Sequence, residues 1–370
     1  MRIEKQGKST IFFEGTVTGE RADASPAVRA LLEYLPHTPS SLVICTQEPV
    51  WSKHGQQLLK ELGSCDFPVH VQVYPDGEAC KTLNHFGHAL EEMVRLGCDR
   101  KSVILAFGGG TVGDSAGFVA ATFMRGISWL YIPTTLLAMQ DASVGGKVAV
   151  NLEQGKNLAG AFWQPEGISL NLRYLRTLSD RHFKSGTMEL IKHGVLKGNP
   201  LYEEMLHFPL SYQQKNRSWH HVCFDGVRVK MDMVDRDYRE AGLRKALNLG
   251  HTLAHALEKV TSFQLYHGEA VGLGLMYACC LAQELGHCFD WKPLEKFIMK
   301  RMPDHLVKSL FDSFPEMNNL LFYTSFDKKK TSGKVTWIIP ERPGKVSFND
   351  QIEESHHKRA FENWKKIIRI

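Results

Sequence analysis

The stretch that decides the fold is Val103-Ile104-Leu105-Ala106-Phe107-Gly108-Gly109-Gly110-Thr111-Val112-Gly113-Asp114. It has the pattern of an apolar strand, a glycine turn and the start of a helix. Glycines let backbone N–H groups approach a pyrophosphate, and the N-terminus of a helix adds positive partial charge. A tight turn without a ligand explains the same residues, and their spacing is not the usual GxGxxG. Both interpretations predict a strand that passes directly into a helix.

Short apolar runs alternate with helical patterns on both sides of this stretch. Such alternation predicts βαβ units around a parallel sheet. We therefore expect a Rossmann-like α/β domain over residues 1–176. The strand-like runs lie at 41–45, 69–74, 103–107 and 130–133, and the helical runs lie at 56–62 and 83–96.

The strand signal fades after about residue 177, where long helical patterns take over. We expect a mainly α-helical domain over residues 177–370. The helical runs lie at 182–196, 219–237, 246–260 and 270–285, with a β run at 335–340 and a closing amphipathic helix at 353–370.

Composition excludes several classes of protein. With 370 residues, 43% of them hydrophobic and 23% charged, the chain is globular rather than disordered. The net charge of +5 without a long basic block gives no reason to expect nucleic-acid binding. The most apolar run, 270–282, is too short to cross a membrane. The eight cysteines form no CxxC pair and the first ten residues are polar, so we expect a cytoplasmic protein with reduced thiols.

A polar stripe marks the second half of the chain. Arg244, Asn248, His251 and His255 are spaced four, three and four residues apart, which on a helix places them on one face. Such a stripe is costly to bury without partners, so it looks like the wall of a polar pocket. With a downstream His267, it suggests a metal and an anionic substrate.

The ligands of that metal do not follow from spacing alone. His251 and His255 lie one helical turn apart, but they lack the glutamate of an HExxH site. Glu189 and Lys192 share a face of another predicted helix. A lone histidine such as His267 is more often structural than a ligand, so both interpretations stay open at this point.

Two further segments combine turn residues with charged groups. Residues 74–78, followed by Lys81, form a Pro-Asp-Gly-Glu turn that turn chemistry explains without a function. Residues 133–147 end in Asp141, two glycines and Lys147 after a strand-like run, which is where ligands bind in α/β sheets. A solvated loop is the alternative there.

In their order along the chain, these motifs resemble the 3-dehydroquinate synthase family. The match runs from about residue 75 to about residue 270. The motifs are Pro75-Asp76-Gly77-Glu78 with Lys81, Gly108-Gly109-Gly110 with Gly113-Asp114, Arg125-Gly126, 133–147, Gly155-Lys156-Asn157, Glu189 with Lys192, 242–255, and His267-Gly268-Glu269-Ala270.

The resemblance implies an enzyme of the shikimate pathway that depends on NAD and Zn²⁺, with Co²⁺ as a substitute metal. It would convert 3-deoxy-D-arabino-heptulosonate 7-phosphate, an anionic sugar phosphate, into 3-dehydroquinate and phosphate. The implied metal ligands are Glu189, His251 and His267, which leaves His255 on the substrate side.

The resemblance also assigns the two binding sites and a homodimer, in which Arg125 would reach a phosphate in the partner subunit. The implied NAD contacts are Glu78, Lys81, Gly109, Gly110, Thr111, Asp114, Thr134, Thr135, Leu137, Asp141, Lys147, Lys156, Thr177 and Leu178. The implied catalytic and substrate contacts are Arg125, Asp141, Lys147, Asn157, Lys192, Arg244, Asn248, His255, Lys328 and Lys329.

Three positions depart from the family pattern. Gln47 and Glu48 stand where the family usually has an acidic residue that reaches the adenosine ribose. Ala142 replaces a common serine, and His182 stands where some members have an acidic residue near NAD. These departures concern the cofactor and leave the implied zinc and substrate residues intact.

Three other functions remain as alternatives. A sister sugar-phosphate cyclase would make an inosose, a valiolone or amino-dehydroquinate. A metal-dependent NAD alcohol dehydrogenase would release reduced cofactor. A non-catalytic binding protein that kept the fold would have lost its pocket residues.

Overall fold

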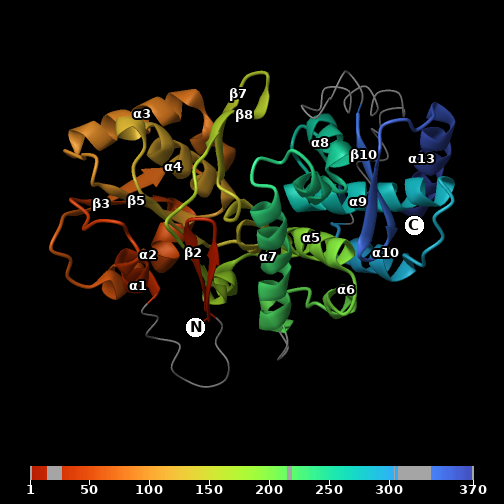
Figure 1. Cartoon of the computed structure of the whole chain (residues 1–370), viewed down its shortest axis with the longest axis horizontal. Coiled ribbons are helices and arrows are strands. Elements are labelled where there is room, and N and C mark those ends of the chain that lie inside the picture. The colour runs from red at the N-terminus through yellow and green to blue at the C-terminus, as the bar shows by residue number, and fades with distance from the viewer. Residues whose placement is uncertain (1, 15–26, 215–218, 304, 307–334, 369–370) are drawn as a thin grey trace. The chain divides into compact units, whose positions relative to one another are not determined.

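The computed structural model describes residues 2–14, 27–214, 219–303, 305–306 and 335–368. The chain divides into two compact units, Met1–Leu178 and Ser179–Ile370. Figure 1 colours the first unit from red to yellow-green and the second from green to blue. The two lysines Lys328 and Lys329, implied as substrate contacts, lie outside the described residues.

A seven-stranded sheet forms the centre of the first unit, in the order β1-β2-β9-β6-β5-β3-β4. Only the β1–β2 pair is antiparallel, and every other neighbouring pair is parallel. The predicted α/β fold with a parallel sheet is therefore confirmed. The strands are β1 (Arg2–Gln6), β2 (Ser9–Glu14), β3 (Leu42–Gln47), β4 (Val69–Tyr74), β5 (Val103–Gly108), β6 (Trp129–Pro133) and β9 (Gly167–Asn171).

Helices follow the strands of this sheet as the alternating pattern predicted. The sequence did not predict β1, β2 or β9. The helical segments are α1 (Ala27–Glu33), α2 (Glu48–Leu62), η1 (Gly77–Lys81), α3 (Leu83–Arg95), α4 (Gly110–Thr122), η2 (Phe123–Arg125), a π-helical turn η3 (Ala138–Ala142) and η4 (Leu172–Thr177).

Glycines within and just after the stretch 103–114 serve close packing as well as the turn. Every residue of β5 is buried. A Cβ atom on Gly113 would lie 2.4 Å from Cζ of Tyr131, and one on Gly117 would lie 2.4 Å from a methyl group of Val148. Because neither position has room for a side chain, α4 packs close to its neighbours only with glycine there.

A hairpin that the sequence did not predict follows directly after the 133–147 segment. Strands β7 (Lys147–Leu152) and β8 (Gly155–Phe162) pair antiparallel. Lys147 therefore begins a strand, and Lys156 and Asn157 lie just after the turn. The short alternating runs on both sides of Gly155 explain the hairpin.

The second unit is mainly helical, as predicted. Helix α9 forms its centre, with fifteen buried residues among its eighteen. The elements are α5 (Asp180–Lys197), α6 (Leu201–Leu206), η5 (Tyr212–Gln214), α7 (Trp219–Arg236), η6 (Leu243–Asn248), α8 (His251–Val260), α9 (His267–Glu284), α10 (Lys292–Met299), β10 (Trp337–Arg342), β11 (Lys345–Asn349) and α13 (Glu354–Ile368).

The single helical stripe expected over 244–255 is wrong. Arg244 and Asn248 lie in the 3₁₀ segment η6, and α8 begins only at His251. Gly250 separates the two with a φ of +81°, a left-handed conformation that favours glycine. A Cβ atom on Gly250 would lie 2.9 Å from the backbone nitrogen of Leu275, so this break lets α8 and α9 approach closely.

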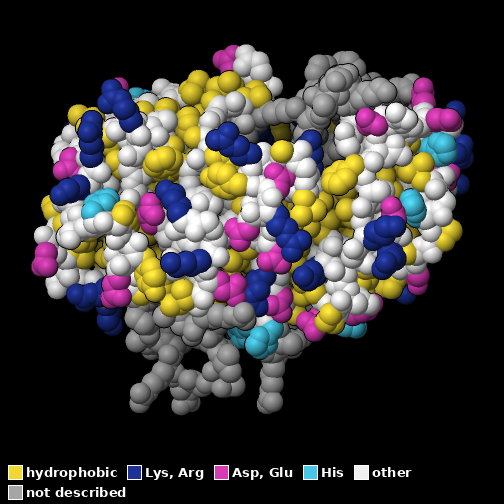
Figure 2. Space-filling model, in the orientation of Figure 1, with side chains coloured by type: hydrophobic (Ala, Val, Ile, Leu, Met, Phe, Trp, Pro, Cys, Tyr) yellow, Lys and Arg dark blue, Asp and Glu magenta, His cyan; other side chains and the backbone are white. Residues whose placement is uncertain are grey.

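The described helices include none that is long and apolar enough to cross a membrane. On the face drawn in Figure 2, Lys and Arg side chains are interspersed with Asp and Glu side chains.

Candidate metal centre and cofactor site

Three side chains of the second unit converge as a metal site would require. Glu189 on α5, His251 at the start of α8 and His267 at the start of α9 each offer a ligand atom, and these atoms lie within 4.8 Å of one another. Nε2 of His251 and Nε2 of His267 each lie 3.4 Å from the same oxygen, Oε1 of Glu189. The Glu189 side chain is fully buried.

This geometry fits a divalent ion. One carboxylate oxygen and two imidazole nitrogens are a common donor set for catalytic Zn²⁺. Around a tetrahedral Zn²⁺ with bonds of about 2.0–2.1 Å, two ligand atoms lie about 3.4 Å apart. The two measured separations of 3.4 Å agree with that value.

The second nitrogen of each imidazole has its own partner. Nδ1 of His251 lies 3.2 Å from the carbonyl oxygen of Leu249. Nδ1 of His267 lies 3.2 Å from Oε1 of Glu258, a buried residue near the end of α8. Hydrogen bonds at Nδ1 leave Nε2 of each ring for a metal.

Glu258 was not singled out from the sequence. Its spacing of seven residues from His251 placed it on the same face of one helix. The carboxylates of Glu189 and Glu258 together raise the pKa of His267 to about 10, against the effect of burial, which lowers it.

Lys192 supplies a positive charge to the same cluster. Its side chain is almost fully buried on α5 and forms an ion pair with Oε2 of Glu189. The predicted shared face of Glu189 and Lys192 is therefore present, and it points into the unit rather than to solvent.

The other implied substrate contacts described in the second unit lie on η6 and α8. Arg244 is buried and donates from Nη1 to the carbonyl oxygen of Tyr238 at 2.5 Å. Asn248 donates to Oε1 of Glu240 at 2.5 Å, and Glu240 adopts a φ of +59°. The ring of His255 lies 5.7 Å from that of His251. His255 therefore lies next to the metal cluster and outside its converging ligand atoms.

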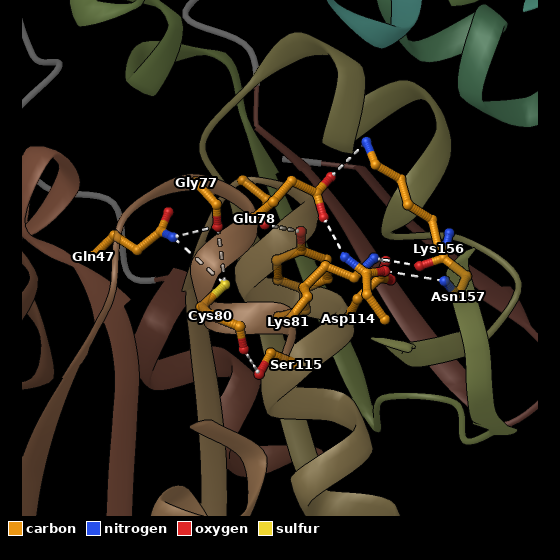
Figure 3. Close-up of polar contacts among 12 residues, drawn as sticks. Gln47, Gly77, Glu78, Cys80, Lys81, Asp114, Ser115, Lys156 and Asn157 are labelled. Carbon is orange, nitrogen blue, oxygen red and sulfur yellow. Dashed lines mark hydrogen bonds and ion pairs between the residues drawn. The ribbon is translucent and has the colours of Figure 1, made fainter. Parts of the chain in front are cut away.

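A second polar cluster lies in the first unit, and Figure 3 shows its side chains pointing toward one another. Nζ of Lys81 donates to Oδ2 of Asp114 at 2.6 Å and to Oδ1 of Asn157 at 2.5 Å. Glu78 accepts from Asn151 at 2.8 Å and pairs with Lys156 at 3.2 Å. These contacts join η1, α4 and the β7–β8 hairpin.

Burial and charge act in opposite directions within this cluster. Burial raises the pKa of Asp114, and Lys81 only partly offsets that effect. Burial lowers the pKa of Lys81, but Asp114 and Glu78 outweigh it and raise that pKa overall. The ammonium group therefore stays charged between its acceptors.

Gln47 holds the turn that carries Glu78 and Lys81. Its Nε2 donates to the carbonyl oxygen of Pro75 at 2.7 Å and to that of Gly77 at 3.2 Å, and Figure 3 shows the Gly77 contact. Carbonyl oxygens only accept hydrogen bonds, so the amide NH₂ faces them. A carboxylate at this position has no donor for either contact.

The glycine turn lies among several of the implied cofactor residues. A Cβ atom on Gly109 would lie 3.3 Å from Thr135, and one on Gly110 would lie 3.2 Å from Ala142. The backbone nitrogen of Thr134 donates to the carbonyl oxygen of Gly108 at 2.9 Å. Helix α4 begins here without a side-chain cap, which leaves first-turn N–H groups for an anion.

The π-helical turn η3 places Asp141 within electrostatic reach of Asp114, where it contributes to the raised pKa of that carboxyl. Thr111 contacts the thiol of Cys80. Leu137 precedes η3 and is half-buried.

Other residues singled out from the sequence have contacts of their own. Thr177 is exposed and hydrogen-bonds Nε2 of His54 at 2.7 Å, next to the half-buried Leu178. His182 lies in the second unit, where its Nδ1 is 2.8 Å from Oγ of Ser179. Arg125 is exposed in a tight turn with a φ of +68°.

Comparisons with known proteins identify the family. The chain matches the sequence model of the 3-dehydroquinate synthase N-terminal domain over residues 71–185 and that of the C-terminal domain over residues 186–328. The chain belongs to the 3-dehydroquinate synthase family. The resemblance found from its motifs is thereby confirmed.

Relatives within the 3-dehydroquinate synthase family cover most of the chain. A 3-dehydroquinate synthase of Leptospira interrogans serogroup Icterohaemorrhagiae serovar copenhageni (strain Fiocruz L1-130) is 39% identical over 315 residues, which cover 84% of this chain and 85% of that protein.

Two solved structures share the fold at lower identity. A 2-deoxy-scyllo-inosose synthase, complexed with carbaglucose-6-phosphate, NAD⁺ and Co²⁺, has a TM-score of 0.80 and 23% identity and covers 100% of this chain and 99% of that one. A 2-epi-5-epi-valiolone synthase from Streptomyces hygroscopicus subsp. jinggangensis 5008, with NAD⁺ and Zn²⁺ bound, has a TM-score of 0.77 and 22% identity and covers 95% and 99%.

Proposed function

We propose that this chain is a 3-dehydroquinate synthase, which converts 3-deoxy-D-arabino-heptulosonate 7-phosphate into 3-dehydroquinate and phosphate. The observation that carries the proposal is the convergence of Glu189, His251 and His267 in a member of this family. A 2-deoxy-scyllo-inosose synthase and a 2-epi-5-epi-valiolone synthase of the same fold bind NAD⁺ together with Co²⁺ and Zn²⁺, respectively.

Glu189, His251 and His267 would hold the metal, and the glycine turn of the first unit would hold NAD. When bound, the metal polarises an oxygen of the substrate and NAD accepts and returns a hydride. Because the hydride is returned, the net reaction is loss of phosphate and ring closure, with no net oxidation.

The chain's own residues bind and orient the substrate. The buried ammonium of Lys192 attracts an anionic group in surroundings where charge is poorly screened by water. Arg244 supplies a guanidinium that suits a carboxylate or a phosphate. His255 adjoins the metal ligands, and we assign proton transfer on the substrate to its imidazole.

Residues of the first unit bind the cofactor and part of the substrate. Lys81 and Asp114 fix α4 to η1, and the first-turn N–H groups of α4 would bind the pyrophosphate of NAD. Asp141, Lys147 and Asn157 are the substrate contacts that we assign to this unit. Holding all reacting groups in one folded arrangement favours ring closure.

The proposal includes a cytoplasmic homodimer in which Arg125 serves the partner subunit. The exposed position of Arg125 in a tight turn suits such a contact. All eight cysteines are free thiols, which suits a reducing compartment.

The test is release of phosphate from the heptulosonate phosphate in the presence of NAD and Zn²⁺, with and without a chelator. We expect one phosphate per 3-dehydroquinate formed, no accumulation of reduced NAD, and loss of activity with chelator that added metal restores. No phosphate release under any cofactor condition would contradict the proposal.

The same assay separates the alternatives. Accumulation of reduced NAD without phosphate release would indicate an alcohol dehydrogenase. Faster turnover of a sugar phosphate that lacks the carboxylate would indicate a sister cyclase. The relatives at 39% identity, named 3-dehydroquinate synthase, favour the substrate with the carboxylate.

A further inference from the structure

The two histidines of the metal centre differ in the hydrogen-bond partner of Nδ1. Nδ1 of His251 lies 3.2 Å from a neutral carbonyl oxygen, that of Leu249. Nδ1 of His267 lies 3.2 Å from a carboxylate oxygen of Glu258. A carboxylate partner makes an imidazole a stronger metal ligand than a neutral partner does.

The position of Glu258 is unfavourable for a purely structural carboxylate. The residue is buried, with 6% of its surface exposed. It lies in the last turn of α8, where the helix dipole disfavours negative charge. A buried charge at such a position costs stability unless a positive partner offsets it.

A divalent ion bound at Nε2 of His267 would provide that compensation. With the metal bound, the imidazole would be neutral and would carry its proton on Nδ1, from which it donates to Glu258 Oε1. The same hydrogen bond fixes the ring so that Nε2 faces Oε1 of Glu189 at 3.4 Å.

We propose that Glu258 is a positioning residue of the metal centre: it orients His267, sets its tautomer and strengthens its bond to the metal. This inference rests on the proposed metal dependence and adds to it a residue outside the three ligands. It also predicts that His267 binds the metal more strongly than His251, because Nδ1 of His267 has a carboxylate partner and Nδ1 of His251 has a carbonyl partner.

The experiment compares two substitutions at Glu258 with a matched control. Glu258→Gln removes the charge but keeps an oxygen that accepts from Nδ1–H, whereas Glu258→Leu removes both. Glu295→Gln removes another buried carboxylate of the same unit, one that pairs with Lys292 on α10. Circular dichroism verifies that each variant is folded.

Affinity for Zn²⁺ and Co²⁺, measured by competition with a chelator, is the first readout. We expect Glu258→Leu to weaken binding about 10- to 100-fold, the range typical for loss of such a partner. Glu258→Gln should lie between this variant and the wild type, and Glu295→Gln should match the wild type.

The visible absorption of the Co²⁺-loaded protein is the second readout. It reports the donor strength of the ligands, so it should shift in both Glu258 variants and not in Glu295→Gln. A folded Glu258→Gln variant with wild-type affinity and spectrum would overturn the inference. A wild-type chain that binds neither metal would overturn the proposed metal dependence itself, together with this inference.

Discussion

The cluster around Lys81 and the cluster around Glu189 are both buried, but they compensate charge differently. In the first unit, the Lys81 ammonium meets the Asp114 carboxylate directly at 2.6 Å, so the pair is complete without a ligand. In the second unit, Lys192 also pairs directly with Glu189 through Oε2, but two imidazole nitrogens approach the other carboxylate oxygen, Oε1, at 3.4 Å each. That convergence is the geometry of ligands around a shared ion.

From this difference we expect the first cluster to fix the shape of a site and the second to perform the chemistry. A network of direct ion pairs fixes the positions of backbone segments, here η1, α4 and the β7–β8 hairpin. A set of converging donor atoms gains its stability from a cation. Substitutions in the two clusters should therefore separate cofactor affinity from metal affinity.

Lys192→Met should have the largest effect. The substitution removes a buried ammonium from the metal cluster and keeps the length of the side chain. Loss of one such charge should lower kcat about a hundredfold or more. In this variant a bound metal ion would offset the negative charge of Glu189 in place of the ammonium. Metal affinity, measured by chelator competition, should therefore remain at the wild-type level or rise.

Lys292→Met is the control, because Lys292 is exposed and pairs with Glu295 away from the cluster. Loss of metal from the Lys192 variant would mean that the ammonium holds Glu189 in place rather than serving the substrate.

Gln47→Glu should produce an intermediate effect confined to the first unit. The carboxylate has no donor for the carbonyl oxygens of Pro75 and Gly77, which now accept from the Gln47 amide. Leaving such groups unsatisfied costs about 1–3 kcal/mol. We expect NAD affinity, measured by titration calorimetry, to fall about tenfold, since 1.4 kcal/mol corresponds to a factor of ten.

Metal affinity should not change in that variant, and Gln56→Glu, on the exposed side of α2, should change neither affinity. If Gln47→Glu instead binds NAD more tightly, then residue 47 contacts the ribose and the Gly77–Lys81 turn does not depend on it.

The smallest expected effect is a pH dependence of folding stability at His357, a histidine of the second unit with no carboxylate partner among the described contacts. Nδ1 of His357 lies 2.8 Å from the hydroxyl of Tyr277, and burial lowers the pKa of His357 to about 4. The imidazole is therefore neutral in the folded state, and the unfolded state takes up a proton first as pH falls. The resulting stability is present above about pH 6.5 and is lost as pH falls toward about 4.

His357→Gln should remove this dependence, which we expect to be about 1–3 kcal/mol between these pH values. Urea unfolding of the chelator-treated protein at several pH values, followed by the fluorescence of tryptophans that include Trp337 and Trp364, measures this pH dependence. Equal pH slopes for the variant and the wild type would show that His357 is solvated in solution.

Local patterns in the sequence predicted strands β3 to β6 and the helices α2, α3 and α4, but not the β7–β8 hairpin. The strands β3 to β6 are apolar runs followed by helical spacing, and the glycine stretch gave β5 and the start of α4. Strands β1, β2 and β9 escaped prediction, because the pairing of β2 with β9 joins segments more than 150 residues apart. The periodicity of a short segment cannot predict which distant strand it pairs with.

The candidate site shows the same limit. The resemblance to the family implied Glu189, His251 and His267 as metal ligands. Their spacing along the chain did not, because only the fold brings α5, α8 and α9 together. The expected stripe over 244–255 failed at Gly250, because its left-handed turn depends on contact with α9. Glu258 carried only the weak signal of helical spacing from His251.

The most direct test of the central claim is metal binding by the purified chain, followed by elemental analysis and chelator competition. The account predicts one Zn²⁺ or Co²⁺ per chain, lost in Glu189→Ala, His251→Ala and His267→Ala and retained in Lys81→Met. Retention of a full equivalent in all three ligand variants, or no metal in the wild type, would contradict it.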